Sequence, residues 1–426
     1  MKSILLEDNP HWVNQKCYDT FISREVLQEA IEFLKTKEVL ALVGARRVGK
    51  STTAKLLIKE LLQTTNPNNI FFINLEKPEF IPYKNDATYL NVIYDEYLKI
   101  ANPDMGKKIY FFIDEVQIFK NWEVFIKSKY ENSNIKFIIT GSNSSLLTSN
   151  YATFLTGRVL KLQIYSFSFS EFLTFKNIPH ETVLEQTTNK IAISRAKDEY
   201  LKWGGYYSVI SNENEMIKKE QLKNIAEDII LKDIVPRYNI KNSSAIKDLF
   251  YYVVSNATTS LNYSTLAKKI GIDAKMIKEY ILYFEDNFLV STIPNYHTKL
   301  TQQIKSTKKL YINDNGFLNL GINRSANMGM RLENFVFNVL SQKNQEVTYI
   351  NDKYEIDFKT DDTLYQISYE IGDEKTLKRE LNSFKHFCKP NNKCKLITYD
   401  TNKTFDGVEV VGFEEFVFNQ IQGITI

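Results

Sequence analysis

Eight consecutive residues, Gly44 to Ser51 (GARRVGKS), have the types and spacing of a phosphate-binding loop. Gly44 and Gly49 allow positive φ angles and a close backbone approach, so N–H groups and a helix N-terminus can face a phosphate. Lys50 would reach the β- and γ-phosphates, and the Ser51 hydroxyl would bind Mg²⁺. We assign no separate role to the loop's two arginines. The residues expected to contact ATP are Gly44, Ala45, Arg46, Arg47, Val48, Gly49, Lys50, Ser51 and Thr52.

A second motif, KKIYFFIDEVQIF, ends an apolar run with two acids, Asp114 and Glu115. A buried strand that stops at paired acids places them at the carboxyl edge of its sheet, where ligands bind in open α/β folds. Asp114 would hold Mg²⁺ through water, and Glu115 would polarise the attacking water. The acidic pair therefore predicts ATP hydrolysis, and not only ATP binding.

The elements that must position these residues alternate between apolar strands and helices. This order predicts an α/β fold with a mainly parallel sheet covered on both faces. Residues 23–36 have the pattern of an amphipathic helix with Ser23 as N-cap, and a helix should follow the loop over Ser51–Leu62. The expected strands are Val39–Val43, Ile70–Leu75, Ile109–Ile113, Phe137–Thr140 and Val159–Ile164. Because Ile70–Leu75 lies between the two motif strands, we expect a P-loop NTPase of the additional-strand class.

Two further segments could sense the γ-phosphate. In FIITGSNSSLL, from Phe137 to Leu147, Ser142 or Asn143 at a strand end could hydrogen-bond the γ-phosphate or the attacking water. In LTGRVLKL, Arg158 precedes a strand and could stabilise the γ-phosphate of its own subunit or of a neighbour. The second route would require a homo-oligomer.

Length and composition limit the other classes of function. The chain has 426 residues, enough for two to four domains, and a net charge of only +3. No apolar run is long enough to span a bilayer, and acids and a proline stand where a signal peptide has its apolar stretch. Three cysteines without metal-ligand spacing favour reduced thiols and a cytoplasmic protein without membrane contact.

After Phe175 the pattern becomes helical and then mixed. Residues 263–284 have the pattern of a helix, a turn at Gly271 and a helix, and an apolar strand over Phe288–Pro294 follows. This order is similar to a winged helix-turn-helix. The domains expected from these changes are an ATPase core over 1–175, a helical lid over 176–240, a winged helix-turn-helix over 241–300 and a C-terminal α/β domain over 301–426.

The order of the motifs resembles the prokaryotic AAA-type ATPases, related to the archaeal ATPases and STAND proteins, that carry a C-terminal domain of unknown function. The resemblance covers nearly the whole chain. Its matching stretches are SREVLQEAIEFL, LVGARRVGKSTTAKLL, FFIDEVQIFKNWEVFIK, IITGSNSSLL, LTGRVLKLQIYSFSFSEFL, YLKWGGYYSVI, IILKDIVPRYNI, KKLYINDNGFLN, NMGMRLENFVFNVL and KYEIDFKTDDTLYQISYE.

The resemblance implies that the last domain is like the core of restriction endonucleases, which needs metal-binding acids and a lysine. Glu333 and Asp357 match the first two acids, whereas the Glu-x-Lys position reads Gln366-Ile367-Ser368. Glutamine is a weak ligand for a hard cation and serine carries no charge. The sequence therefore predicts a retained fold whose nuclease site is inactive.

The sequence leaves two alternatives for contacts with DNA. The second helix of the predicted helix-turn-helix, Asp273–Asp286, has an apolar face that favours packing over groove binding. Four lysines in or after the wing could contact phosphates, or could belong to a solvated loop. These lysines are Lys299, Lys305, Lys308 and Lys309.

Three functions are consistent with these patterns. The first is an ATP hydrolase whose nucleotide cycle moves C-terminal domains that bind a nucleic acid or a protein. The second is an ATP-regulated DNA nuclease that uses Glu333 and Asp357. The third is a scaffold that holds ATP without hydrolysing it.

Overall fold

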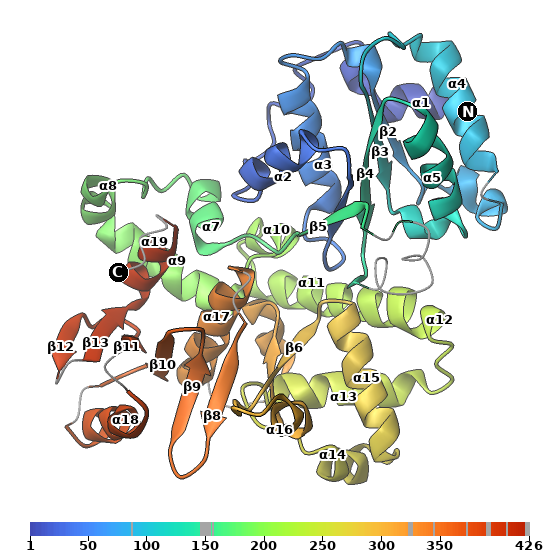
Figure 1. Ribbon diagram of the computed structural model, residues 1–426. Coiled ribbons are helices and arrows are strands. Elements are labelled where there is room, and N and C mark those ends of the chain that lie inside the picture. Colours follow the sequence, from blue (N-terminus) through green and yellow to red (C-terminus); the bar gives the residue numbers. More distant parts are fainter. Residues whose placement is uncertain are drawn as a thin grey trace. The chain divides into compact units, whose positions relative to one another are not determined.

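The chain forms two compact units, Met1–Asn177 and Ile178–Ile426 (Figure 1). The computed structural model describes residues 1–86, 88–144, 155, 157–322, 327–343, 346–371, 374–388, 393–405 and 408–421. No helix in these ranges combines the length and apolar character that a membrane crossing requires.

The first unit is built on a five-stranded parallel sheet with the order β2-β3-β4-β1-β5. Helices α2 and α3 lie on one face, and α1, α4 and α5 lie on the other (Figure 1). The strands are β1 (Val39–Val43), β2 (Ile70–Asn74), β3 (Ile109–Asp114), β4 (Ile135–Gly141) and β5 (Val159–Gln163). The helices are α1 (Lys2–Asp8), α2 (Leu27–Leu34), α3 (Lys50–Leu61), α4 (Tyr89–Ala101), α5 (Trp122–Asn132) and α7 (Phe169–Phe175).

The predicted fold class is confirmed, but the additional strand is a different one from the strand that we expected. The strand that separates β1 from β3 in the sheet is β4, whereas β2 lies outside β3. The order of strands along the chain therefore differs from their order in space, because each helical crossover can carry the chain past a neighbouring strand. The additional-strand arrangement is present, but β4 supplies it instead of the segment Ile70–Leu75.

Helix α2 begins at Leu27, so the prediction of an N-cap at Ser23 is wrong. The Arg24 side chain, which a helix starting at Ser23 would carry in its first turn, is instead buried against the loop before α3. Its Nη1 donates to the Val48 carbonyl at 3.0 Å and its Nε lies 2.9 Å from Glu171 Oε1. These tertiary contacts compete with the local helix signal, which is weak at a helix end.

The first half of the second unit is helical. Helix α11 continues through a π-helical turn, η6, into α12. Pro236 lies inside α12, where it has no N–H to donate to the helical hydrogen bonds. The helices are α8 (Val183–Thr188), α9 (Lys190–Trp203), α10 (Tyr207–Ile210), α11 (Glu215–Asp228), η6 (Ile229–Ile234), α12 (Val235–Arg237) and α13 (Ser243–Ser255).

Helix α14 (Tyr263–Ile270), a turn with Gly271 in the left-handed region and helix α15 (Ala274–Asp286) follow in the predicted order. A hairpin of β6 (Val290–Pro294) and β7 (Lys308–Ile312) comes next, with α16 (Leu300–Lys305) in its connection. The α15 residues Ile277, Tyr280, Ile281 and Phe284 are buried, which confirms that this helix face packs inside the protein. The assignment as a winged helix remains a prediction.

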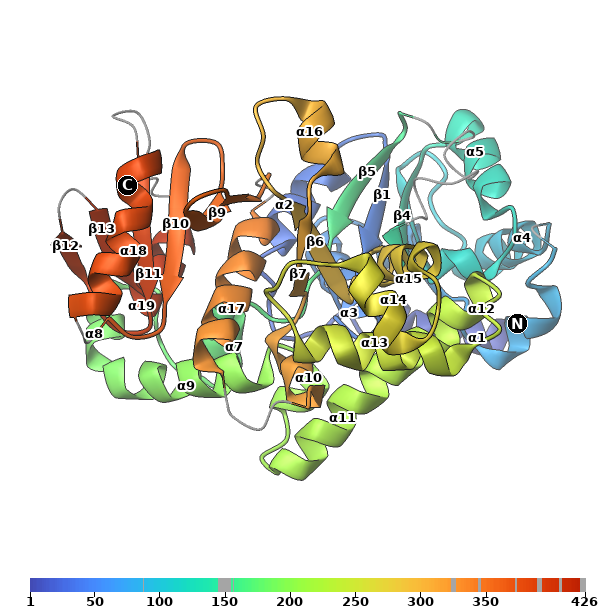
Figure 2. The ribbon, with the colours of Figure 1, turned by 90° about the horizontal axis from the view of Figure 1, so that it is seen from below.

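The end of the second unit is a six-stranded mixed sheet with the order β12-β13-β11-β10-β9-β8. Helix α17 contacts β10 and β7, and lies between the β6–β7 hairpin and this sheet (Figure 2). The elements are η7 (Asn315–Leu320), α17 (Met328–Gln342), β8 (Thr348–Asn351), β9 (Glu355–Lys359), β10 (Thr363–Ser368), α18 (Glu374–Phe387), β11 (Lys393–Thr398), β12 (Lys403–Phe405), β13 (Val408–Gly412) and α19 (Phe413–Ile421).

The two glycines after α9, Gly204 and Gly205, allow close packing within this unit. A Cβ on Gly204 would lie 1.8 Å from Asp314 Oδ1, so only glycine fits there. Asp314 Oδ2 accepts a hydrogen bond from the Gly205 N–H at 2.9 Å, and Arg331 donates to the Lys202 carbonyl at 3.0 Å. Three of the quoted sequence stretches therefore join at the C-terminal end of α9.

Two of the three cysteines, Cys388 and Cys394, lie close enough to form a disulfide, and the reduced state of the thiols remains a prediction. Cys388 directly follows α18 and Cys394 lies near the start of β11, so the fold brings their Cα atoms to 6.4 Å, within the range that a disulfide spans. Cys17 is a free thiol.

Candidate functional site

The predicted phosphate-binding loop connects β1 to α3 at the carboxyl edge of the sheet. Gly49 has φ 99° and stands as the N-cap of α3, where its left-handed conformation turns the backbone into the helix. A Cβ on Gly44 would lie 2.1 Å from the Ile164 carbonyl oxygen, so this position needs glycine for close packing. The loop therefore has the glycine-dependent shape that the sequence indicated.

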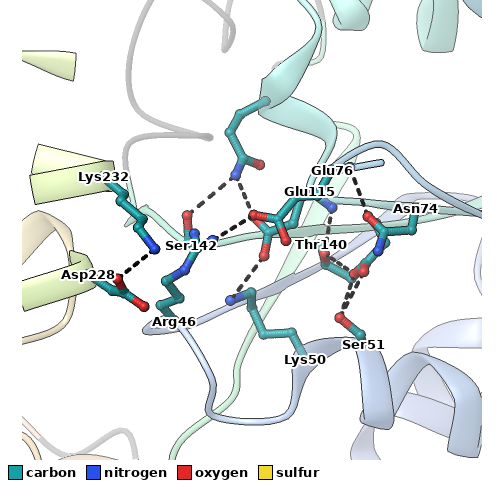
Figure 3. Close-up of polar contacts among 12 residues, drawn as sticks. Arg46, Lys50, Ser51, Asn74, Glu76, Glu115, Thr140, Ser142, Asp228 and Lys232 are labelled. Atoms are coloured by element: carbon teal, nitrogen blue, oxygen red, sulfur yellow. Dashed lines mark hydrogen bonds and ion pairs between the residues drawn. The ribbon is translucent and has the colours of Figure 1, made fainter. Parts of the chain in front are cut away.

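Lys50 and the two acids lie at the same edge of the sheet. The Lys50 Nζ lies 3.3 Å from Glu115 Oε1 and donates to the Ala45 carbonyl at 3.1 Å (Figure 3). Both side chains of this ion pair are less than a tenth exposed. Burial by itself would raise the pKa of Glu115, but the charge of Lys50, with further help from Gln117 and Arg46, lowers it.

Asp114 contacts the hydroxyl predicted to bind the metal. Ser51 Oγ donates to the Asp114 carboxylate at 2.8 Å, and Thr140 Oγ1 donates to it at 2.6 Å. Burial raises the pKa of Asp114 to about 6, against these hydrogen bonds and the charge of Lys50. The carboxylate is thus a buried anion that a nearby cation would stabilise.

These oxygens suit Mg²⁺, which prefers oxygen ligands and usually combines one or two carboxylates with phosphate oxygens and water. Ser51 Oγ and the Asp114 carboxylate are adjacent, and both are hard donors. They would hold the ion, which would neutralise phosphate charge when bound. No chemistry in this part of the site depends on soft sulfur or imidazole ligands.

Thr140, on β4, is a site residue that sequence reasoning missed. Its hydroxyl accepts the Glu115 backbone N–H at 2.9 Å while it donates to Asp114. One hydroxyl therefore contacts the Asp114 carboxylate at the end of β3 and the backbone of Glu115, which follows it. The available signal was a polar residue at the carboxyl end of an apolar run, but the pairing of β3 with β4 was needed to interpret it.

The two predicted γ-phosphate sensors lie at different edges of the sheet. Ser142 and Asn143 follow the end of β4 and are buried, beside the acids. Residues 145–147 of the same predicted segment lie outside the described residues. Arg158 comes just before β5, where its carbonyl accepts the Val39 N–H, so it lies at the amino edge.

The structure does not bring Arg158 to the loop. The five residues of β1, Val39–Val43, separate this edge from the loop by about 15 Å at the usual strand rise. Its Nη1 instead lies 2.8 Å from Glu131 Oε1, and its guanidinium lies over the Tyr130 ring. Of the two predicted routes, contact with its own subunit's γ-phosphate does not fit this geometry.

Arg24 is a second missed residue, and it supports the loop from behind. Its guanidinium donates to the carbonyls of Val48 and Tyr165 at 3.0 and 2.8 Å and pairs with Glu171. Three of its donors are thus used on separate segments. Arg46, by contrast, pairs with Glu76 at 2.9 Å near the end of β2.

Comparison with known proteins agrees with this geometry. The profile of the AAA domain matches residues 36–173, and that of a domain of unknown function (DUF8612) matches residues 194–327. An uncharacterized protein of Haemophilus influenzae is 31% identical over 92% of this chain and 97% of its own length. An uncharacterized protein of Methanocaldococcus jannaschii is 30% identical over 92% of this chain and 89% of its own.

The chain belongs to this AAA-domain family. The predicted relation to P-loop ATPases is therefore confirmed, and nucleotide binding is implied by the domain. Among solved structures, the Walker-type ATPase of Pyrococcus abyssi has a TM-score of 0.43 and 13% identity, and covers 71% of this chain and 96% of that one.

Outside the AAA domain, the fold gathers the predicted nuclease-like acids around a lysine. Glu333 on α17 and Asp357 on β9 each have an oxygen 3.7 Å from the Nζ of Lys309, and Glu355 has one at 2.6 Å. Gln366, at the expected Glu-x-Lys position, donates to Glu380 at 2.9 Å. No group of three or more His, Cys, Asp or Glu side chains in the described ranges is arranged to hold a metal ion.

Neither of the two alternatives left open for Lys309, contact with phosphates or a place in a solvated loop, fits the structure. Its side chain is only 6% exposed because β7 faces it toward the three acids. The charges of these acids, against the effect of burial, raise the pKa of Lys309 above its usual range. Lys299 and Lys305, in contrast, are exposed beside and within α16.

Proposed function

We propose that the protein binds ATP with Mg²⁺ and hydrolyses it, using Lys50, Asp114 and Glu115. The observation that carries this proposal is the 3.3 Å contact between the Lys50 Nζ and Glu115, with Asp114 bonded to Ser51 beside them. A cation, a metal-binding carboxylate and a second carboxylate then surround one position at the carboxyl edge of the sheet, where α/β proteins bind ligands.

The ion pair suggests how binding prepares the site. When a triphosphate enters, Lys50 exchanges the Glu115 carboxylate for phosphate oxygens. Glu115 is then free to accept a proton from water, and Asp114 stays anchored by Thr140. Ser142 or Asn143 would contact the γ-phosphate or that water. ATP binding would thus separate the Lys50–Glu115 ion pair and leave Glu115 able to act as a general base.

Phosphate release from the purified protein tests the proposal. Lys50→Ala should lower the rate by about 10²–10³-fold, because it removes a preorganised cation from the phosphates. Lys59→Ala, near the other end of the same helix and paired with Asp19, is the matched control and should retain activity. Equal rates for wild type and Lys50→Ala would defeat the proposal.

We further propose that nucleotide turnover moves the C-terminal parts, which bind a nucleic acid or protein partner in the cytoplasm. The proposed divisions are the ATPase core over 1–175, a lid over 176–240, a winged helix over 241–300 and an endonuclease-like domain over 301–426. Arg158 would act on a neighbouring copy, if the protein forms a homo-oligomer. A pull-down with ATP-trapped Glu115→Gln, analysed for protein and nucleic acid, tests the partner.

Two alternatives have distinct signatures. A nuclease would show Mg²⁺-dependent DNA cleavage that Asp357→Ala abolishes. The missing Glu-x-Lys argues against it, because Gln366 and Ser368 at that position carry no charge. A scaffold that only holds ATP would show slow turnover that does not depend on Glu115.

A further inference from the structure

Gln117 lies in a tight turn directly after the two acids. Glu115 has φ 54°, a left-handed conformation that is uncommon for a residue with a side chain. The 3₁₀ turn η4 (Val116–Ile118) follows at once. The chain therefore bends back on itself, and the Gln117 side chain returns to the Glu115 carboxylate. Strained backbone of this kind often occurs at functional sites.

The hydrogen bonds fix the orientation of the Gln117 amide. Its Nε2 donates to Glu115 Oε2 and, at 3.4 Å, lies within reach of Ser142 Oγ. An ionised carboxylate only accepts hydrogen bonds, so the amide atom that faces it must be the nitrogen. The oxygen is then the atom of this amide that is left to accept a hydrogen bond.

That oxygen, Oε1, is buried and accepts no hydrogen bond from any residue in the described part of the chain. A buried acceptor without a donor costs about 1–3 kcal/mol of stability. Oε1 is therefore an acceptor that can take a hydrogen bond from a water molecule. Oε1 lies on a side chain that touches Glu115, whose other oxygen contacts the phosphate-binding Lys50.

We propose that Gln117 positions the attacking water in ATP hydrolysis: its Nε2 holds Glu115, and its Oε1 accepts a hydrogen bond from the water. This inference rests on the proposed ATP hydrolysis. The water oxygen forms a bond to the γ-phosphorus while the bond from that phosphorus to the β–γ bridging oxygen breaks. One water proton passes to Glu115, ADP and phosphate leave, and Gln117 is unchanged.

Two substitutions separate the two halves of this role. Gln117→Met keeps the length of the side chain but removes both donor and acceptor, and should lower kcat by about 10–100-fold. Gln117→Glu keeps acceptor oxygens but loses the donor to Glu115, and should also lower kcat. Binding of an ATP analogue should change by less than about twofold in both, because neither atom contacts the loop. Gln63→Met, at an exposed position just after α3, is the control.

The split between turnover and binding distinguishes positioning from a merely structural role. If Gln117 positions the water, its loss should lower kcat and leave the affinity for an ATP analogue almost unchanged. A structural defect in the turn after Glu115 should weaken both.

The outcomes separate the two proposals. If wild type hydrolyses ATP and Glu115→Gln does not, a Gln117→Met variant with wild-type kcat overturns the role of Gln117. A loss of kcat matched by equally weakened nucleotide binding would also overturn it, because it indicates a structural defect. If wild type itself releases no phosphate, the proposed function fails and this inference falls with it.

Discussion

Glu115→Gln should lower kcat for ATP hydrolysis by about 10²–10⁴-fold, the usual contribution of a general base. The amide has almost the shape of the carboxylate, so the contact with Gln117 and the backbone bond to Thr140 can remain. What disappears is the negative charge 3.3 Å from Lys50 and the ability to accept a proton. ATP should still bind, and at least as tightly, because Lys50 no longer has to leave an ion pair.

Phosphate release and the affinity for an ATP analogue, measured on the same preparation, test this expectation. Glu32→Gln, an exposed glutamate in the same unit that pairs with Lys35, serves as control. A variant that binds ATP and retains wild-type turnover would remove Glu115 from the mechanism and favour the scaffold alternative. A variant that loses binding instead would mean that the carboxylate supports the loop.

Lys309→Met should destabilise the second unit by about 3–5 kcal/mol at pH 8, the usual cost of removing one partner from a buried ion cluster. Methionine fills similar space, so the loss would come from charge. Even with Lys309 present, burial and the charge of Asp357 raise the pKa of Glu333 to about 8. Burial raises the pKa of Asp357 to about 6.

The loss should depend on pH, and its sign follows from these shifts. Acids with raised pKa values bind more protons in the folded state than in the unfolded state, so they lower stability as pH rises from about 4 to about 8. Without Lys309 these pKa values would rise further. The difference in Tm between Lys309→Met and wild type should therefore be largest near pH 8 and smaller near pH 5.

Thermal unfolding at the two pH values provides the measurement, and Lys308→Met, one position earlier on β7, is the control. A Lys309→Met protein as stable as wild type at pH 8 would show that water, not the lysine, compensates the acids. A loss that is equal at both pH values would point to lost packing.

Predictions from the sequence were most accurate where the signal is local. The strand Val39–Val43 has the expected bounds, and the helix after the loop begins within one residue of its predicted start. The reason is that apolar periodicity and glycine placement act over a few residues. The N-cap at Ser23 failed because contacts of Arg24 with residues far along the chain outweigh a local capping preference.

The site itself divides in the same way. The meeting of Lys50, Ser51, Asp114 and Glu115 was predictable, because their spacing along one turn and one strand end places them at the same edge of the sheet. Thr140 was not, because its two hydrogen bonds exist only when β4 pairs with β3. Arg158 was placed correctly before a strand, but its edge of the sheet depends on the direction of pairing with β1.

The sequence by itself determined an AAA-type nucleotide site and the alternation of strands and helices that supports it, because these depend on neighbouring residues. Only the tertiary structure decided which polar groups face the acids. It turned Gln117 back to Glu115, and it buried Lys309 among Glu333, Glu355 and Asp357. Such pairings join elements or close a strained turn, so they depend on the free energy of the whole packed unit.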